Sequence, residues 1–280
     1  MFQTLIEPQQ LFEHLDDPDW RVIDCRFDLA DPEAGQRAFL EGHIPGAVYA
    51  HLERDLSGPV GEKAGRHPLP DAGALIAKLS GWGVGPATQV IACDDANGAM
   101  AARLWWLLGW LGHENVAVLN GGLAAWREAG LPLVSEASAP AAARFERRSP
   151  VRQMVSADEV LDAVEGRADW RLVDARAPER YLGKVEPIDA AAGHIPAALN
   201  RPFMENLDAA SRFLPAGELR ARFQGIAAGR ADRVVHYCGS GVTACHNLLA
   251  MEIAGLPGSR LYPGSWSEWI TDPDRPRSQG

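Results

Sequence analysis

The sequence predicts an α/β protein of two tandem domains, each a parallel sheet flanked by helices. Its 280 residues exceed what one hydrophobic core usually organises. Short runs rich in β-branched residues alternate with helical patterns, which favours a parallel sheet with helices on both faces. Segments of the first half return in the second half in the same order, which indicates a duplicated domain.

Four pairs of segments carry this repeat. Each pair shares its spacing of apolar, small and charged residues, and the pairs are 20–26 with 170–176, 42–47 with 193–198, 90–94 with 234–238, and 120–126 with 263–269. The period is too long for a solenoid, so it marks whole domains. We predict a first domain over 1–135, a linker rich in Ala, Ser and Pro over 136–149, and a second domain over 150–280.

The elements of each copy follow from local patterns. In the first copy, strands are predicted over 21–24, 47–49, 90–93 and 117–119, and helices over 72–79 and 99–111. In the second copy, a buried strand is predicted over 234–237 and a helix over 242–253. Ligands of such sheets bind beyond the carboxyl ends of the strands, so the residue after 237 is a candidate for chemistry.

Composition excludes several classes of function. The formal net charge is −10, which argues against nucleic acid or an anionic membrane surface as a partner. The N-terminal segment has no basic region or apolar core of signal-peptide length, and no apolar run approaches the length of a membrane span. We therefore expect a cytoplasmic protein. Four cysteines without a CxxC pair indicate neither a disulfide framework nor a zinc site.

Cys238 is the predicted nucleophile. It stands where the predicted strand ends and a small-residue loop leads into a helix. Gly239 and Gly241 let the backbone curl so that successive N–H groups point inward, beside the positive end of the helix. Such a nest stabilises a thiolate, so Cys238 should ionise readily. A buried structural cysteine at a strand end is the alternative interpretation.

The remaining cysteines are expected to have structural roles. They are Cys25, Cys93 and Cys245, and a part for Cys245 in redox control stays open because it lies so near the nucleophile in sequence. Cys238, Cys245, His236 and His246 could be imagined as metal ligands. Side chains on a strand and along the following helix diverge, so we expect no metal site there.

The two copies also separate scaffold from chemistry. His43 and His194 stand in the same turn motif, and Asp24 and Asp174 are each followed by an arginine two residues on. Features that both copies share are expected to be structural. Asp94 aligns with the nucleophile of the second copy, and the acidic loop that it begins is not expected to form an anion cradle. We therefore expect the nucleophile and its anion cradle in the second domain alone.

These motifs resemble those of tandem rhodanese domains over nearly the whole chain. The Asp-x-Arg, Gly-His-Ile-Pro and Gly-x-x-x-x-Trp signatures occur in both copies. The loop from Cys238 to Thr243 is similar to that of 3-mercaptopyruvate sulfurtransferases. Thiosulfate-preferring relatives carry an arginine and a lysine where this chain has Gly239 and Ser240. The resemblance implies two rhodanese-like domains, of which the second is catalytic.

The implied activity is sulfur transfer through a persulfide on Cys238. The donor would be 3-mercaptopyruvate, and the acceptor would be a thiol, thioredoxin or cyanide. Backbone N–H groups of the loop would stabilise the charge of the persulfide, and they belong to Gly239, Gly241, Val242 and Thr243. The resemblance implies no metal or organic cofactor.

The resemblance also assigns residues outside the loop. Arg180 matches the family arginine that grips the donor's carboxylate, for which a planar guanidinium is suited. Asp55 and His67 match a family pair that, with Ser240, forms a proposed proton relay to the leaving group. Animal mercaptopyruvate enzymes carry a second arginine a few residues after the first, and residues 185–189 offer none here.

Three alternative interpretations concern the same loop. A thiosulfate-preferring sulfurtransferase would use the same nucleophile with another donor. A non-enzymatic sulfur carrier or regulatory module is the alternative that does not require catalysis. A cysteine-dependent phosphatase is rejected, because its loop would need an arginine at the end, where this chain has Ala244 before Cys245.

Overall fold

The chain folds into two compact units. The computed structural model describes residues 1–136 and 138–280; Ala137, in the predicted linker, lies outside them. The units are not simple halves of the sequence. One comprises Met1–Gly58, Pro70–Val151 and Ala210–Arg212, and the other comprises Pro59–Leu69, Arg152–Ala209 and Phe213–Gly280. A short segment of the N-terminal half therefore belongs to the second unit.

The first unit is an α/β domain. Its strands are β1 (Leu5–Ile6), β2 (Trp20–Asp24), β3 (Val48–Tyr49), β4 (Gln89–Cys93) and β5 (Val116–Leu119). Its helices are α1 (Pro8–Phe12), α2 (Ala34–Glu41), α3 (Ala72–Gly81), α4 (Ala101–Trp110) and α5 (Gly122–Glu128). The strands pair in the order β1-β5-β4-β2-β3, and every pair is parallel. The predicted linker has no regular element over 138–150.

The second unit repeats this architecture. Its strands are β6 (Gln153–Met154), β7 (Arg171–Asp174), β8 (Leu199–Asn200), β9 (Val234–Tyr237) and β10 (Arg260–Leu261). Its helices are α6 (Ala157–Val164), α7 (Pro178–Tyr181), α8 (Ala216–Ala227), α9 (Ala244–Ile253) and α10 (Ser265–Trp269), with 3-10 turns at Phe203–Asn206 and Ala231–Arg233. The parallel order β6-β10-β9-β7-β8 matches that of the first unit rank for rank. The predicted duplication and fold class are confirmed.

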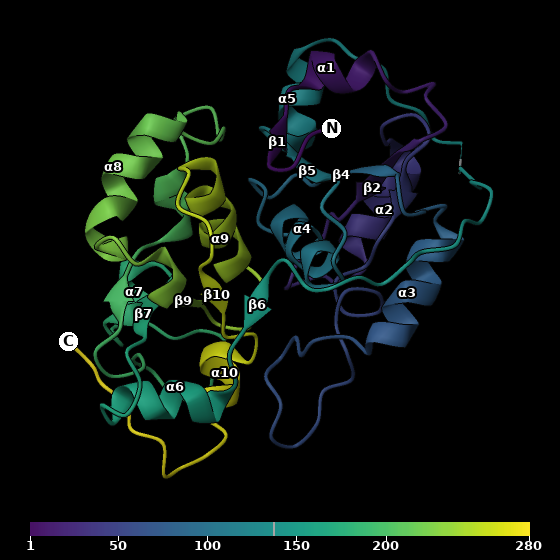
Figure 1. The fold of residues 1–280 in the computed structure, drawn as a ribbon. Helices are drawn as coiled ribbons and strands as arrows, with labels where there is room; N and C mark the ends of the chain where they lie inside the picture. Colours follow the sequence, from purple (N-terminus) through teal and green to yellow (C-terminus); the bar gives the residue numbers. More distant parts are fainter. Residues whose placement is uncertain (137) are drawn as a thin grey trace. The chain divides into compact units, whose positions relative to one another are not determined.

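Alternation along β9 shows how the second sheet is covered on both faces. Val235 and Tyr237 pack in a core with residues of α6 and α10, including Trp266. His236 points to the opposite face, where its ring meets Met251 of α9. Because successive side chains of a strand alternate, both faces of this strand are buried. Figure 1 shows α8 and α9 on one side of these strands and α6 and α10 on the other.

Most predicted elements are confirmed to within two residues at each end. The strand predicted over 234–237 has those bounds, whereas the helix predicted over 242–253 begins at Ala244. Val242 and Thr243 belong instead to the turn before it: their carbonyls accept hydrogen bonds from the N–H groups of Cys245 and His246. The apolar character of Val242 extends the helical pattern, but the left-handed backbone of Gly241, with φ of +76°, delays the helix.

The motifs shared by both copies are structural, as predicted. In each unit, the arginine of the Asp-x-Arg motif is paired with the aspartate at 2.7 Å. The same guanidinium donates to the carbonyl of the glycine that opens the Gly-His turn. His43 and His194 each bond a backbone carbonyl through Nδ1 and stack on an aromatic ring. Each pair thus ties a strand end to the following turn.

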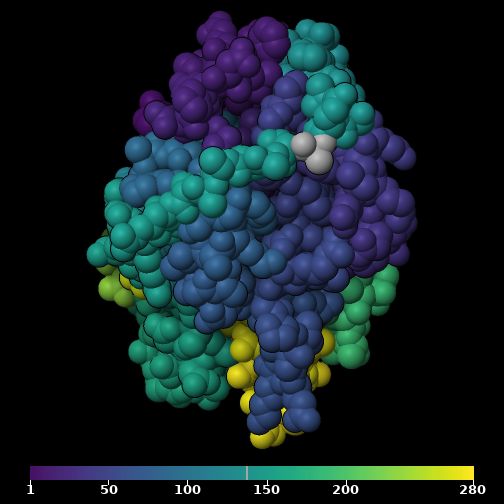
Figure 2. Space-filling model, turned by 90° about the vertical axis from the view of Figure 1, so that its right-hand side faces the viewer, coloured from purple at the N-terminus to yellow at the C-terminus, as the bar shows by residue number. Residues whose placement is uncertain are grey.

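Segment 59–69 lies against the C-terminal part of the second unit. In Figure 2 its blue atoms contact yellow atoms of that region. A Cβ on Gly65 would lie 2.5 Å from the carbonyl oxygen of Gly264, so the two backbones approach too closely for any other residue. Within the part of the chain that the structure describes, no helix is both long and apolar enough to cross a membrane.

Candidate active site

Cys238 lies directly after β9, at the carboxyl end of the second sheet. It is 2% exposed, and its Sγ accepts a hydrogen bond from the N–H of Gly241 at 3.2 Å. A Cβ on Gly241 would lie 2.2 Å from the carbonyl oxygen of Pro263, so glycine is required both for this close approach and for the left-handed backbone. The sulfur thus sits inside a curled loop with an N–H group aimed at it.

The loop is anchored to α10. The carbonyls of Cys238 and Gly239 accept from the N–H groups of Trp266 and Ser267 at 3.0 and 2.9 Å. Oγ of Ser265 accepts from the N–H of Cys238 at 3.1 Å and donates to the carbonyl of Tyr262 at 2.9 Å. Ser265 has a φ of +55°, which is uncommon outside glycine. Its hydroxyl therefore fixes the backbone of Cys238 from a strained position.

Segment 59–69 brings two side chains to this loop. The N–H of Arg66 donates to Oγ of Ser267 at 3.0 Å. Nδ1 of His67 is hydrogen-bonded to Oγ of Ser240 at 2.8 Å, and both side chains are nearly buried. The predicted contact of His67 with the nucleophile loop is therefore present.

Arg180 is held beside the loop by two acidic residues. It lies in α7, and its Nη2 is 2.7 Å from Glu186 and 3.0 Å from Asp189. Glu186 also pairs with Arg176, of the scaffold motif, at 3.3 Å. Asp189 pairs in addition with Arg66. Positive and negative side chains therefore alternate in a series of ion pairs that runs from the Asp-x-Arg motif to the loop after Cys238. Its members are Arg176, Glu186, Arg180, Asp189 and Arg66.

Both Arg66 and Arg180 face Gly239. A Cβ at that position would lie 2.8 Å from Nη2 of Arg66 and 3.6 Å from Nη1 and Nη2 of Arg180. The sequence predicted only one cation here. Burial lowers the pKa of Arg66, and the neighbouring positive charge of Arg180 lowers it further, while the negative charge of Cys238 opposes that change.

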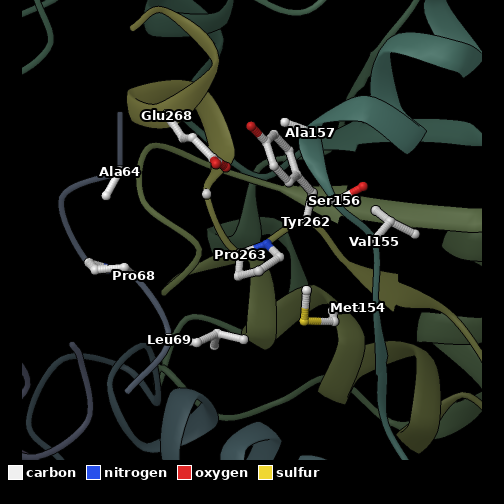
Figure 3. A pocket seen from close by; sticks show the side chains of 12 residues that line it. Ala64, Pro68, Leu69, Met154, Val155, Ser156, Ala157, Tyr262, Pro263 and Glu268 are labelled. Carbon is white, nitrogen blue, oxygen red and sulfur yellow. The ribbon is translucent and has the colours of Figure 1, made fainter. Parts of the chain in front are cut away.

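A cavity of about 240 Å³ lies on the other side of segment 59–69. Figure 3 shows Ala64, Pro68 and Leu69 along one wall, with Met154 and Pro263 opposite them. Its lining is largely apolar. The segment thus presents Ala64, Gly65, Pro68 and Leu69 to this cavity, and Arg66 and His67 to the nucleophile loop.

Asp55 belongs to the first unit. Its carboxylate accepts from the N–H of His51 at 2.7 Å and pairs with Lys78. Its membership in a relay with His67 and Ser240 stays a prediction.

The first unit does contain an anion cradle, which corrects the sequence interpretation. Asp94, 1% exposed, accepts four backbone hydrogen bonds at 2.8–2.9 Å from the N–H groups of residues 96, 98, 100 and 101. The loop curls as its counterpart does, but its own carboxylate occupies the centre. The acidic character of the loop was taken as evidence against an anion cradle. In fact one of its acidic residues, Asp94, is the anion that the cradle holds.

The other thiols and histidines behave as core residues. Burial raises the pKa of Cys25 and of Cys93 well above the ordinary range. Burial lowers the pKa of His236 to about 3, and its Nε2 lies 3.0 Å from Sδ of Met251. Sγ of Cys245 donates to the carbonyl of Gly241 at 3.3 Å. Among the described residues, no three metal-ligating side chains gather as a metal site requires.

Sequence reasoning missed the residues that frame the two arginines. Arg66, Glu186, Asp189 and Ser265 were given no role. One signal was available: the acidic residues of 185–189 follow Arg180 only in the second copy. For Arg66, the only available signal was its neighbour His67, which the resemblance assigned to the relay.

Comparison with known proteins agrees with this architecture. The rhodanese-like domain family matches residues 7–129 and 156–272. A Pseudomonas aeruginosa protein named probable 3-mercaptopyruvate sulfurtransferase is 51% identical, over 99% of this chain and 98% of its own. Mouse thiosulfate sulfurtransferase is 32% identical, over 100% of this chain and 97% of its own.

Solved structures give the same result. The 3-mercaptopyruvate sulfotransferase of Escherichia coli superposes with a TM-score of 0.82 at 32% identity, covering 95% of this chain and all of its own. The 3-mercaptopyruvate sulfurtransferase of Leishmania major superposes with a TM-score of 0.84 at 30% identity, covering 95% of this chain and 74% of its own. The chain therefore belongs to the rhodanese-like domain family, of which it contains two domains.

Proposed function

We propose that the chain is a sulfurtransferase that takes sulfur from 3-mercaptopyruvate and passes it on through a persulfide of Cys238. The observation that carries this proposal is the N–H of Gly241 aimed at Sγ of Cys238 at 3.2 Å, in a loop at the carboxyl end of a parallel strand. A preorganised donor at that place stabilises negative charge on sulfur, first on the thiolate and then on the persulfide. The names of the relatives support the same activity.

The first step is attack of the Cys238 thiolate on the sulfur of 3-mercaptopyruvate. A sulfur–sulfur bond forms and the carbon–sulfur bond of the donor breaks. The electron pair leaves on carbon as the enolate of pyruvate, which takes up the proton that the donor's thiol loses. The products are an anionic persulfide and pyruvate, so atoms and charge balance without a cofactor.

A proton must therefore move from sulfur to carbon during this step. We assign its transfer to Ser240 and His67, whose side chains are hydrogen-bonded at 2.8 Å, and Asp55 completes the relay as predicted from the sequence. General acid–base groups of this kind contribute about 10²–10⁴-fold to a rate. Arg180 binds the donor's carboxylate, and the N–H groups of Gly239, Gly241, Val242 and Thr243 line the persulfide's place.

The second step regenerates the enzyme. An acceptor thiol, such as that of thioredoxin, or cyanide attacks the outer sulfur of the persulfide. The sulfur–sulfur bond breaks, the acceptor keeps the sulfur, and Cys238 leaves as a thiolate. With cyanide the product is thiocyanate, and with a thiol it is a new persulfide.

Intact-protein mass tests the first step directly. After brief exposure to 3-mercaptopyruvate, the protein should gain the mass of one sulfur atom, and a thiol reductant should remove it. Cys238→Ser should gain none, because a hydroxyl cannot carry a sulfane sulfur. Cys245→Ser is the matched control and should gain sulfur as the unmodified protein does. Sulfur on Cys238→Ser but not on Cys245→Ser would overturn the assignment of the nucleophile.

Turnover separates an enzyme from a carrier. Repeated cycles with donor and cyanide should release many molecules of pyruvate and thiocyanate per chain. A single release of pyruvate that stops after one equivalent, with all acceptors tried, would instead identify a sulfur carrier.

A further inference from the structure

The cavity behind segment 59–69 is a feature that the activity proposed above does not use. Its volume is about 240 Å³, and all the residues that line it belong to the second unit. An apolar cavity of about 150 Å³ already takes up benzene, so this one has room for an aromatic ring with a short side chain. The side chains of Arg66 and His67 lie instead against the loop after Cys238, so the cavity is separate from the donor site.

Most of the cavity wall is apolar. In Figure 3, Leu69 and Met154 lie at one end of the cavity, and Pro68 and Pro263 lie along its sides. The thioether of a methionine makes favourable contacts with aromatic rings. Burial of apolar surface against such a wall contributes about 25 cal/mol per Å². The wall therefore favours a ligand with an apolar body.

The other end of the cavity is polar. Figure 3 shows Tyr262 and Glu268 there. Tyr262 is 1% exposed, and its hydroxyl has no hydrogen-bond partner among the described residues. Burial raises the pKa of this hydroxyl well above its usual range, and the nearby negative charge of Glu268 raises it further. A buried hydroxyl without a partner costs free energy, which a bound ligand would recover.

The carboxylate of Glu268 is also available to a ligand. It folds over Gly264, where a Cβ would overlap it, and no cation among the described residues lies within ion-pair distance of it. Arg275, a cation whose charge reaches Tyr262, is engaged elsewhere. Its guanidinium pairs with Asp272 at 3.8 Å and lies over the ring of Trp269.

The start of α6 borders the same cavity and adds negative charge. Oγ of Ser156 accepts from the N–H of Glu159 at 3.2 Å, and the carboxylate of Glu159 accepts from the N–H of Ser156 at 2.7 Å. This capping box uses both side chains within the helix turn. The charge of Asp158, in the same turn, acts on Tyr262 together with that of Glu268. An anion bound here would face both carboxylates, so the charges favour a cation.

We propose that this cavity is a binding site for a small amine: its apolar body packs against the apolar wall, and its ammonium group donates to Tyr262 and Glu268. An ammonium group has three donors and no acceptor, so it satisfies a phenol oxygen and a carboxylate at once. The proposal goes beyond the sulfurtransferase activity, because neither the sulfur donor nor the persulfide enters this cavity.

Three probes of matched size test the proposal. 2-Phenylethylamine is the amine, 2-phenylethanol has the same shape without the charge, and 3-phenylpropionate carries the opposite charge. In calorimetric titrations the amine should bind at least 10-fold more tightly than the alcohol, because a hydrogen bond to a charged group has an effect of about that size. The carboxylate should bind more weakly than either. Equal affinities for amine and alcohol, tightest binding of the carboxylate, or no binding of any probe would overturn the proposal.

Two substitutions of a carboxylate show whether the amine binds at this place. Glu268→Gln should lower the affinity for the amine to that for the alcohol and leave the affinity for the alcohol unchanged, which also shows that the cavity is intact. Glu165→Gln removes a half-exposed carboxylate that pairs with Arg167, and it should bind all three probes as the unmodified protein does. Equal losses in the two variants would mean that the amine follows the net charge of the protein, contrary to the proposal.

A third substitution keeps the test decisive if Glu268→Gln does not fold. Ala64 borders the cavity from segment 59–69, so Ala64→Trp should fill the space and abolish binding of both the amine and the alcohol. Unchanged amine binding by a folded Ala64→Trp protein would exclude this cavity as the site.

Hydrogen exchange locates the bound amine without any need for sulfur transfer. Since Gly65 and Leu69 line one wall and Gly264 lines another, saturating 2-phenylethylamine should slow amide exchange over 64–69 and 262–264 and leave residues 116–119 of the first unit unchanged. The amine would thereby restrain the segment that carries His67. Protection confined to other segments would refute the site, whereas a failure to form a persulfide would refute the proposed activity alone.

Discussion

The proton relay proposed for His67 and Ser240 should matter for one sulfur donor and not for the other. The leaving group of 3-mercaptopyruvate needs a proton, whereas that of thiosulfate does not. Their hydrogen bond of 2.8 Å joins segment 59–69 to the nucleophile loop. Pyruvate leaves as a carbanion equivalent that must be protonated, whereas sulfite leaves as a stable anion. His67→Ala should therefore slow persulfide formation from 3-mercaptopyruvate by about 100-fold and affect thiosulfate far less. Single-turnover kinetics with each donor measure this difference.

The control for this prediction is Ser240→Ala, which removes the other partner of the same hydrogen bond. It should show the same dependence on the donor. If His67→Ala slows both donors equally, the residue shapes the site and transfers no proton.

At this scale the sequence predicts Cys238 as a nucleophile and the relay beside it, but it did not predict a second cation, Arg66, near Gly239. Cys238, Gly239 and Gly241 are adjacent in the chain, so their geometry follows from local turn chemistry. Arg66 meets Gly239 only through a tertiary contact between segments more than a hundred residues apart, at which Gly65 meets Gly264. The resemblance predicted that His67, the next residue, meets Ser240 of this loop, but nothing in the sequence placed Arg66 there.

The curled loop after the fourth strand is an element that both units share. In one unit its centre holds Sγ of Cys238, and in the other it holds the carboxylate of Asp94. In the first unit, the carboxylate of Asp94 already satisfies the N–H groups of its loop. The loop after Cys238 has no carboxylate of its own, so an anion from outside the protein can bind there. The same backbone can therefore be catalytic in one copy and purely structural in the other.

Removing Asp94 should thus affect stability and leave the chemistry of Cys238 unchanged. Asp94→Ala leaves four buried or part-buried backbone N–H groups without their acceptor, and should lower the free energy of unfolding of the first unit by about 2–4 kcal/mol. Chemical denaturation measures this loss, and Asp95→Ala, at an exposed neighbour, is the control. A folded Asp94→Ala protein that forms no persulfide would show that the first unit takes part in chemistry.

For the whole molecule, the repeat was the most informative feature of the sequence. It predicted two domains of one α/β class, and the matching strand orders confirm it. The repeat did not predict that Pro59–Leu69, a segment of the N-terminal half, belongs to the second unit. Its place depends on backbone contacts such as that of Gly65 with Gly264, and such contacts follow no periodic pattern in the sequence.

The buried histidine of β9 couples the stability of the protein to pH. Burial lowers the pKa of His236 to about 3, whereas an unfolded chain protonates a histidine near 6.5. Between these values the unfolded state binds more protons than the folded state, so stability rises with pH. As the pH falls from about 7 to about 5, this one residue should cost about 2 kcal/mol.

Replacing His236 by leucine should remove that part of the pH dependence. The Tm of the unmodified protein, measured by calorimetry, should fall more steeply between these two pH values than that of His236→Leu. His14→Gln, at a half-exposed histidine, is the matched control and should keep the steep fall. The difference between slopes is the informative quantity, since other groups titrate in both proteins and cancel. Parallel curves for the unmodified protein and His236→Leu would mean that His236 does not resist protonation in the folded state.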